Sequence, residues 1–385
     1  MDWNRIVNKE KGLRCAEKIA DWIYGMQPLR HEQHVQVGSV PAVICLTGEE
    51  IQPHNWTTAF AVMGLLGSAE AFNNALYREA ALDMGEYLKT LQVFNPFCAE
   101  NYGAIREYNP QTTWCFTRDA LSAAWAFIVL YKATGDKEYL ERAHLWGEWY
   151  LNKGLDESGW PVSAVVFTPS RIKQAEPVTK WNTLLGYFQA GGLNYLKLMA
   201  DVTGDQEWTG KAYYNIADML VKYMQEPSGR YSSVEKATKK FPENRNHPFV
   251  RDDFASLGLL GAYKLSGNKS YLESVEKYLR YAYDRQREDG SFDKCTASSA
   301  VVLNITLEAD GIADTSFIKA QQVTRAFDHL LGAQCDGYIN RRMRGGLLED
   351  PDGIGLANQT HLRGSGYGLL FLLKACAGIK QCLQS

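Results

Sequence analysis

The sequence repeats a short pattern three times: ThrGlyAsp at 134–136, ThrGlyAsp at 203–205 and SerGlyAsn at 266–268. Each copy opens a charged stretch rich in Tyr and Trp. Each stretch then closes on a second turn: AspGluSerGlyTrp at 156–160, GluProSerGlyArgTyr at 226–231 and GluAspGlySerPhe at 288–292. The glycines of opening and closing turns are 24, 25 and 23 residues apart. This nearly constant spacing indicates an internal repeat.

The opening turn has a direct physical reading. Its Gly can end a helix at positive φ, and the following Asp or Asn can cap the next helix. An apolar stretch, 120–131, precedes the first turn, and an amphipathic stretch, 137–151, follows it. The pattern therefore predicts a hairpin of a buried inner helix and an outer helix with one polar face.

Weaker copies extend this pattern along the chain. Inner-type helices are expected near 55–67, 297–308 and 361–377, and outer-type helices near 10–25, 74–92 and 316–333. The total is twelve helices, or six hairpins. We predict an all-α fold, an (α/α)6 barrel, formed by residues 1–385 as a single domain, with an open helical superhelix as the alternative.

Composition limits the classes of function. The net charge of −3 and the spread of Lys and Arg along the chain argue against a nucleic-acid partner. The N-terminus lacks the apolar segment of a signal peptide, and no apolar run is long enough to span a membrane. We therefore expect a cytoplasmic protein without a membrane partner. The eight cysteines form no CysXXCys pair, so reduced thiols are expected rather than a metal site, and no cofactor is expected.

The long segments that lead into the inner helices are the expected location of the functional site. They cover 26–54, 94–115, 156–180, 227–249 and 335–360, and all of them should lie at one end of the barrel. Polar and aromatic residues stand where these segments meet the inner helices. Aromatic faces and fixed polar groups in a bowl suit a sugar. The candidate substrate-binding residues are His54, Trp56, Arg118, Trp181, His247, Arg251, His361 and Arg363.

Each candidate also has a purely structural interpretation. Asp119 and Asp252 could complement a helix dipole, His247 could order the loop before Pro248, and the tryptophans could be core residues. The recurrence of ArgAsp at 118–119, ArgAspAsp at 251–253 and HisLeuArg at 361–363 at equivalent places favours a functional role.

The hairpins with their ThrGlyAsp turns resemble the six-hairpin glycosidase superfamily over most of the chain. In addition, LeuArgGlySerGlyTyrGlyLeuLeu at 362–370 is similar to a segment of unsaturated glucuronyl and rhamnogalacturonyl hydrolases. In those enzymes the segment lies in a middle hairpin, whereas here it opens the last one, so their catalytic residues are not carried over. The Arg-rich rim also fits the β-glucuronidases that share this toroid.

These observations predict a glucuronidase-like glycoside hydrolase acting on an anionic oligosaccharide. Asp252, near Asp253 and two Phe residues, is the predicted general acid, and Asp119, beside Arg118, is the predicted base. One alternative is a sugar epimerase resembling the N-acylglucosamine 2-epimerases, with His247 and His361 as its catalytic pair. The fourth inner helix here lacks that family's GlyHisXXGluTrp type of sequence. A polysaccharide lyase, a prenyl-type cyclase and a non-catalytic carbohydrate-binding toroid also remain open, as does a homo-oligomer.

Overall fold

The computed structural model describes residues 1–27, 37–97, 100–162, 164–168, 171–174, 192–231, 250–252, 254–336, 340–349 and 359–379. The chain forms two compact units that interleave in sequence. Unit 1 contains Met1–Tyr87, Pro248–Arg251 and Leu279–Gln384, and unit 2 contains Leu88–His247, Asp252–Tyr278 and Ser385. Two of the boundaries fall within helices, α4 (Ala75–Leu91) and α10 (Lys269–Tyr283). The single-domain organisation stays a prediction.

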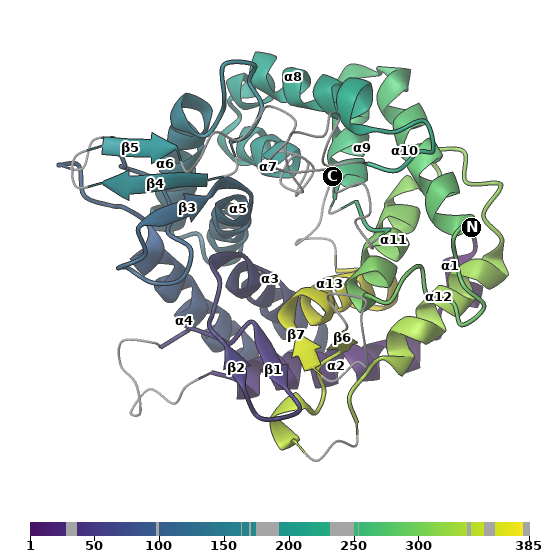
Figure 1. Cartoon of the computed structure of the whole chain (residues 1–385). Coiled ribbons are helices and arrows are strands. Elements are labelled where there is room, and N and C mark those ends of the chain that lie inside the picture. The colour runs from purple at the N-terminus through teal and green to yellow at the C-terminus, as the bar shows by residue number, and fades with distance from the viewer. Residues whose placement is uncertain are drawn as a thin grey trace. The chain divides into compact units, whose positions relative to one another are not determined.

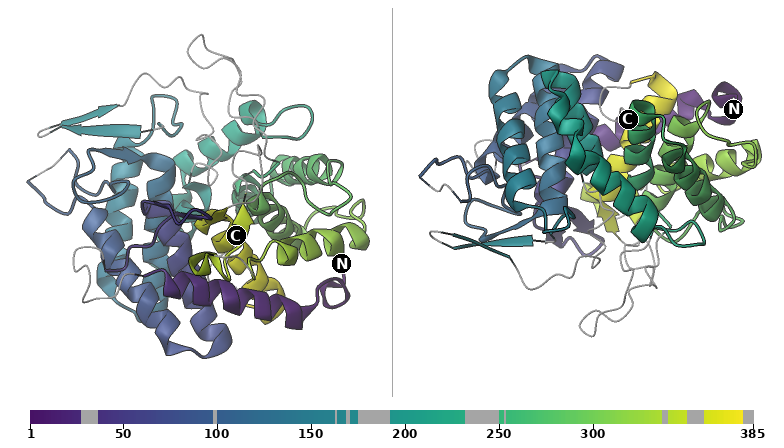
Figure 2. Two further views of the ribbon diagram at one scale, coloured as in Figure 1. Left: turned by 60° about the horizontal axis from the view of Figure 1, so that its bottom comes forward. Right: turned by 90° about the horizontal axis from the view of Figure 1, so that it is seen from above.

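Unit 1 has three inner helices that pack side by side. Helix α13 (Leu362–Leu372) lies between α3 (Asn55–Phe72) and α11 (Thr296–Ala309) (Figure 1). Every residue from Asn55 to Ser68 is buried, as expected for a helix covered on all sides. The outer helices α2 (Lys9–Gly25) and α12 (Ala320–Gly332) each bury one face. Helix α2 runs against α13 and α3 (Figure 2).

Unit 2 repeats this arrangement. Helix α7 (Leu193–Thr203) packs between α5 (Thr117–Thr134) and α9 (Ala255–Ser266) (Figure 1). The outer helices are α6 (Lys137–Lys153), packed on α5, and α8 (Lys211–Met219), packed on α7 and α9. The alternation of inner and outer helices predicted from the repeat is therefore present in both units. A short helix, α1 (Trp3–Ile6), precedes the first outer helix.

The repeat turns have the predicted geometry. Gly135, Gly204 and Gly267 end α5, α7 and α9 at φ values of 76°, 73° and 69°. A Cβ atom at any of the three would meet no atom within 4 Å, so backbone conformation alone selects glycine. The side chain of Asp136 accepts a hydrogen bond from the backbone N–H of Glu138 and caps α6.

Two features differ from the prediction. The outer element after Gly204 is divided into a 3-10 turn (η3, Gln206–Thr209), α8 and a π-helical turn (η4, Leu220–Met224). A second π-helical turn, η7 (Leu373–Ala377), follows α13. The long segments before the inner helices also form β-structure, which hydrophobic periodicity could not reveal because the strands have only two to five residues.

These strands form one antiparallel sheet in each unit. In unit 1 the order is β2 (Glu50–Ile51), β1 (Val43–Cys45), β7 (Gln359–His361) and β6 (Leu348–Glu349), with Val43 opposite His361. In unit 2 the order is β3 (Trp114–Phe116), β4 (Ala164–Thr168) and β5 (Arg171–Gln174). Strands β3 and β7 run directly into α5 and α13. The sheets therefore fix the first turns of these two inner helices, where the candidate site residues lie.

Candidate active site

Asp119 and Arg118 lie in the first turn of α5. The Nε of Arg118 donates to Oδ1 of Asp119 over 2.9 Å. The carboxylate is buried, at 2% exposure, whereas the Arg118 side chain is 29% exposed. The hydroxyl of Thr117, the preceding residue, donates to the carbonyl oxygen of Val162 and ties the helix start to the neighbouring loop. The ion pair is thus anchored inside unit 2 with its cationic side open to solvent.

A second carboxyl group, Glu107, joins this pair. Its side chain is hydrogen-bonded to Asp119 and is only 1% exposed. Burial, followed by the negative charge of Asp119, raises the pKa of Glu107 well above its usual 4.5, although Arg118 opposes this shift. Two carboxyl groups in such contact titrate together, and Glu107 keeps its proton to higher pH than an isolated Glu would. Glu107 was not predicted from the sequence.

Asp252, the predicted general acid, precedes the first turn of α9 in unit 2. Its Oδ1 accepts the backbone N–H of Phe254 over 3.0 Å, and its Oδ2 accepts that of Ser256 over 2.7 Å. Phe254 itself has a φ of 75°, a left-handed conformation that these bonds help to hold. Both oxygens therefore receive donors that favour a charged carboxylate, which suits a base better than an acid.

In unit 1, His54, Trp56 and His361 gather between the starts of α3 and α13. The Trp56 Nε1 donates to Nδ1 of His54 over 3.3 Å. The rings of Trp56 and His361 are 5.9 Å apart with a tilt of 38°. Register in the sheet brings His361 there, because β7 pairs with β1 just before α3 begins.

Four residues, three of them buried and Arg363 slightly exposed, form a cluster beside these rings. The Glu349 Oε1 accepts hydrogen bonds from Cys295 Sγ at 2.7 Å and from Arg363 Nε and Nη2 at 3.0 and 2.5 Å. Arg251 Nη1 lies 3.3 Å from the same sulfur atom. Glu349 is fully buried, yet the arginine and the thiol keep its pKa below the usual value. Burial raises the pKa of Cys295, so this thiol stays protonated.

A hydrogen bond to the backbone of α13 determines which ring nitrogen of His361 carries the hydrogen. Its Nδ1 accepts the backbone N–H of Arg363 over 2.9 Å and caps α13. Burial and the neighbouring Arg363 lower the pKa of His361 to about 3. The ring is therefore neutral, and because Nδ1 is an acceptor, Nε2 carries the hydrogen. At neutral pH this Nε2 is a hydrogen-bond donor.

The sequence candidates that the structure describes are distributed over both units. His54, Trp56, Arg251, His361 and Arg363 lie together in unit 1, and Arg118 and Asp119 lie together in unit 2, to which Asp252 also belongs. Trp181 and His247, like Asp253, fall outside the described residues. Their roles, and those of the other candidates, stay predictions.

Glu107 and Glu349, which sequence reasoning missed, share one signal. Both come from the long segments before inner helices, at 94–115 and 335–360, which were predicted to form the site. Neither occupies a helix start, the only positions that were searched for candidates. An acidic residue in one of these long segments is a possible buried partner for the ArgAsp or HisLeuArg motif at the start of an inner helix.

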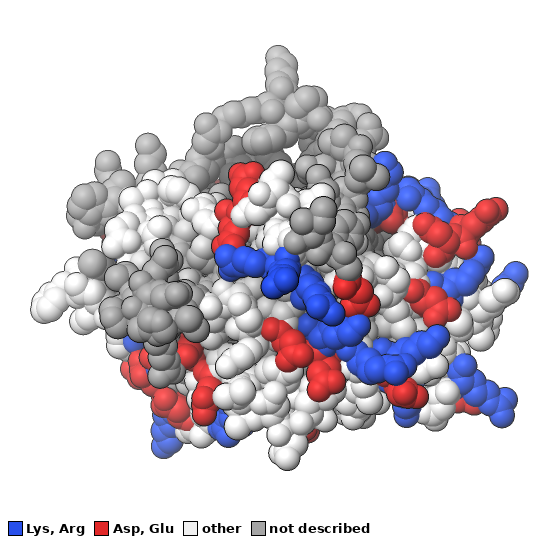
Figure 3. Space-filling model, turned by 90° about the horizontal axis from the view of Figure 1, so that it is seen from below, with Lys and Arg blue, Asp and Glu red and all other residues white. Residues whose placement is uncertain are grey.

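The described residues contain no group of three or more His, Cys, Asp or Glu placed to hold a metal ion. No helix in that part of the chain is long and apolar enough to cross a bilayer. On the face in Figure 3, a strip of Lys and Arg side chains has acidic side chains beside it. That face therefore does not present a single sign of charge.

Comparison with known proteins gives the fold but no sequence family. No family model matches the chain, and no curated protein matches it. A sugar epimerase from a ruminal bacterium is similar in structure, with a TM-score of 0.70, 13% identity, and 98% of this chain and 100% of that chain covered.

Two hydrolase structures are also similar. An unsaturated glucuronyl hydrolase specific for heparin has a TM-score of 0.67 and 15% identity, covering 98% of this chain and 100% of that one. An α-1,6-mannanase from Salegentibacter has a TM-score of 0.61 and 13% identity, covering 96% and 99%. It was inactivated at two aspartates and was solved with α-1,6-mannotriose bound. These similarities confirm that the chain has the (α/α)6-barrel fold shared by these glycosidases and epimerases.

Proposed function

We propose that this protein is a glycoside hydrolase that cleaves a uronic-acid-containing saccharide, with Asp119 and Glu107 at the reacting centre. The contact between these two buried carboxyl groups, with the raised pKa of Glu107, is the observation that carries the proposal. The similar mannanase, which was inactivated at two aspartates, supports carboxylate chemistry on this fold.

Glycosidic cleavage first requires a protonated carboxyl group, and the raised pKa of Glu107 favours this form in the pair. Asp119 gives the shared proton to the glycosidic oxygen as the bond from that oxygen to the anomeric carbon breaks. Glu107 acts through Asp119 as a positioning residue that keeps the proton available. Arg118 then stabilises the carboxylate that is left behind.

The second requirement is an ionised carboxylate that accepts a proton from the attacking water. We assign this role to Asp252, whose backbone hydrogen bonds favour its charged form. The water oxygen joins the anomeric carbon, and its proton goes to Asp252. The contacts of Asp119 and Asp252 thus favour the reverse of the acid and base roles expected from the sequence.

Arg118 supports a uronic acid as the substrate. Its side chain is partly exposed and lies at the N-terminus of α5, where the helix dipole adds positive potential. A planar guanidinium matches a carboxylate in bidentate geometry. Arg118→Gln should raise the KM for an aryl glucuronide and leave that for the corresponding glucoside nearly unchanged. Equal changes for the two substrates would contradict this assignment.

The catalytic assignment is tested by conservative variants. Asp119→Asn and Glu107→Gln should each lower kcat on the aryl glucuronide by at least about a hundredfold, because each removes the shared proton. Glu141→Gln is the matched control, since Glu141 is exposed on the outer helix α6. A folded Asp119→Asn variant with wild-type kcat would overturn the proposal.

A sugar epimerase is the second candidate, and His361 favours it. The ring is neutral with its hydrogen on Nε2, and it lies 5.9 Å from the ring of Trp56, so a hydrogen-bond donor and an aromatic ring are both available to a sugar. The fixed tautomer makes His361 a donor rather than a base, so an epimerase would need another residue to remove the substrate proton. For this candidate, His361→Ala should abolish turnover while Asp119→Asn remains active.

A further inference from the structure

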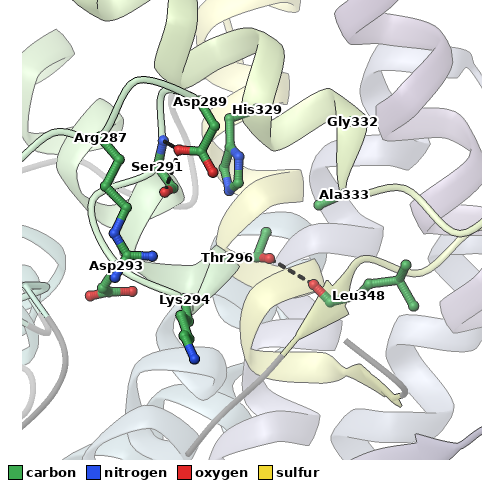
Figure 4. Close-up of a pocket in the computed structure, with 10 residues that line it drawn as sticks. All are labelled: Arg287, Asp289, Ser291, Asp293, Lys294, Thr296, His329, Gly332, Ala333 and Leu348. Carbon is green, nitrogen blue, oxygen red and sulfur yellow. Dashed lines mark hydrogen bonds between the residues drawn. The ribbon is translucent and has the colours of Figure 1, made fainter. Parts of the chain in front are cut away.

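A pocket of about 520 Å³ lies in unit 1 between the turn after α10, the end of α12 and strand β6, and several charged side chains line it (Figure 4). Its volume is in the range of small-molecule sites. Lys294 and Thr296 line this pocket, whereas Cys295 between them bonds to the buried cluster. Residues 294–296 therefore border both the pocket and the buried cluster. Lys294 and Thr296 line the pocket, and Cys295 belongs to the cluster.

The pocket carries cationic donors that the protein leaves unused. Arg287 and Lys294 are both exposed, and within the described residues neither side chain takes part in a hydrogen bond or an ion pair. Together they offer eight N–H donors. Such donors suit a ligand that brings negatively charged oxygen atoms.

The two carboxylates of the pocket, Asp293 and Asp289, accept different numbers of hydrogen bonds. Asp293 accepts three hydrogen bonds: from the backbone N–H groups of Val250 and Cys295 and from the Ser298 hydroxyl. The Oδ1 of Asp289 accepts the backbone N–H and the hydroxyl of Ser291. Among the residues that the structure describes, none donates a hydrogen bond to Oδ2 of Asp289, and the ring of His329 lies beside this carboxylate (Figure 4).

We propose that this pocket binds a sugar bearing an acidic group, with Arg287 and Lys294 holding the oxyanion and Asp289 accepting a sugar hydroxyl. The residues of this pocket belong to unit 1, whereas the proposed catalytic pair belongs to unit 2. Asp293, which also lines the pocket, accepts the backbone N–H groups of Val250 and Cys295.

His329 provides a local probe of occupancy. Burial lowers its pKa from 6.5, and the charge of Asp289 acts against this shift. A bound oxyanion should raise its titration midpoint by about half a pH unit, since a nearby negative charge favours the imidazolium form. The measurement is a pH titration of the histidine ring signals by NMR, with His329 assigned from the spectrum of His329→Gln.

D-glucuronate should move this midpoint, and D-glucose should not. Inorganic phosphate should act only at higher concentration, because it brings no sugar hydroxyl for Asp289. The shift should disappear in the double variant Arg287→Gln/Lys294→Gln and persist in the control Lys277→Gln, an exposed lysine on α10 that does not line the pocket.

Three outcomes would overturn the proposal: no shift with glucuronate, an equal shift with glucose, or a shift that survives the double variant. Tighter binding of phosphate than of glucuronate would overturn the assignment to a sugar. Because His329 reports on the pocket alone, these results are independent of whether Asp119→Asn retains activity.

Discussion

The carboxyl pair of Glu107 and Asp119 predicts a pH dependence of stability. In the unfolded chain Glu107 loses its proton near pH 4.5, whereas in the folded protein it keeps the proton to higher pH. Below pH 4.5 both states are protonated. Above it, the free energy of unfolding falls until the folded pKa is passed, by at most about 1.4 kcal/mol per pH unit.

Glu107→Gln removes this loss because glutamine cannot ionise and can still donate to Asp119. Its free energy of unfolding, relative to wild type, should therefore increase as the pH rises from about 4.5 to 7.5. Urea denaturation across this range measures the difference, with Glu141→Gln as the control that should show no trend. A difference that is constant or falls with pH would mean that Glu107 ionises normally.

Not all residues of the candidate site could be predicted from the sequence, because some of them reach the site through contacts between segments that are distant in the chain. The ArgAsp motif at 118–119 could be recognised as a helix start with an ion pair, because both residues are adjacent. The raised pKa of Glu107 depends on the contact between its loop and the first turn of that helix. Hydrophobic periodicity carries no information about such a contact. The same holds for Glu349, which reaches Arg363 through sheet pairing.

Helix α13 shows why its glycine-rich start can pack so closely. A Cβ atom on Gly364 would lie 2.1 Å from Oε2 of Glu349, and one on Gly366 would lie 3.1 Å from the Cβ of Phe60 on α3. These glycines therefore serve packing, whatever the resemblance of their segment to one in other hydrolases. Gly364→Ala would push Glu349 away from Arg363 and leave a buried charge with weaker compensation.

We expect Gly364→Ala to lower the free energy of unfolding by about 1–3 kcal/mol, the usual cost of overpacking. Gly25→Ala is the matched control, because Gly25 ends α2 and an added Cβ there meets no atom within 4 Å. That control should be neutral or stabilising. Chemical denaturation compares the two variants, and equal stability of both would show that Glu349 can relax without cost.

At the level of elements, the sequence located the helices well and the strands not at all. The inner helices are long and apolar, and their ends carry Gly and Asp signals, so α5 and α6 begin and end close to where the pattern placed them. The strands are short, and partners distant in the chain define them, as β1 and β7 show. Local sequence patterns could not reveal pairing between strands so far apart in the chain.

For the whole molecule, the repeat of helical hairpins was sufficient to predict the (α/α)6-barrel fold, which the structural similarities confirm. Reaction type was not determined in the same way, since epimerases and hydrolases share this fold. The choice between them depends on the side chains of the site, and its most direct test is the identity of the product.

The decisive measurement is a proton NMR time course of the wild-type protein with a disaccharide that contains a glucuronic acid residue. Hydrolysis predicts that the anomeric signal of the glycosidic linkage disappears while the signals of two free sugars grow in equal amounts. If the glycosidic signal instead persists while signals of an epimerised sugar appear, the hydrolase assignment is contradicted and the chain is an epimerase.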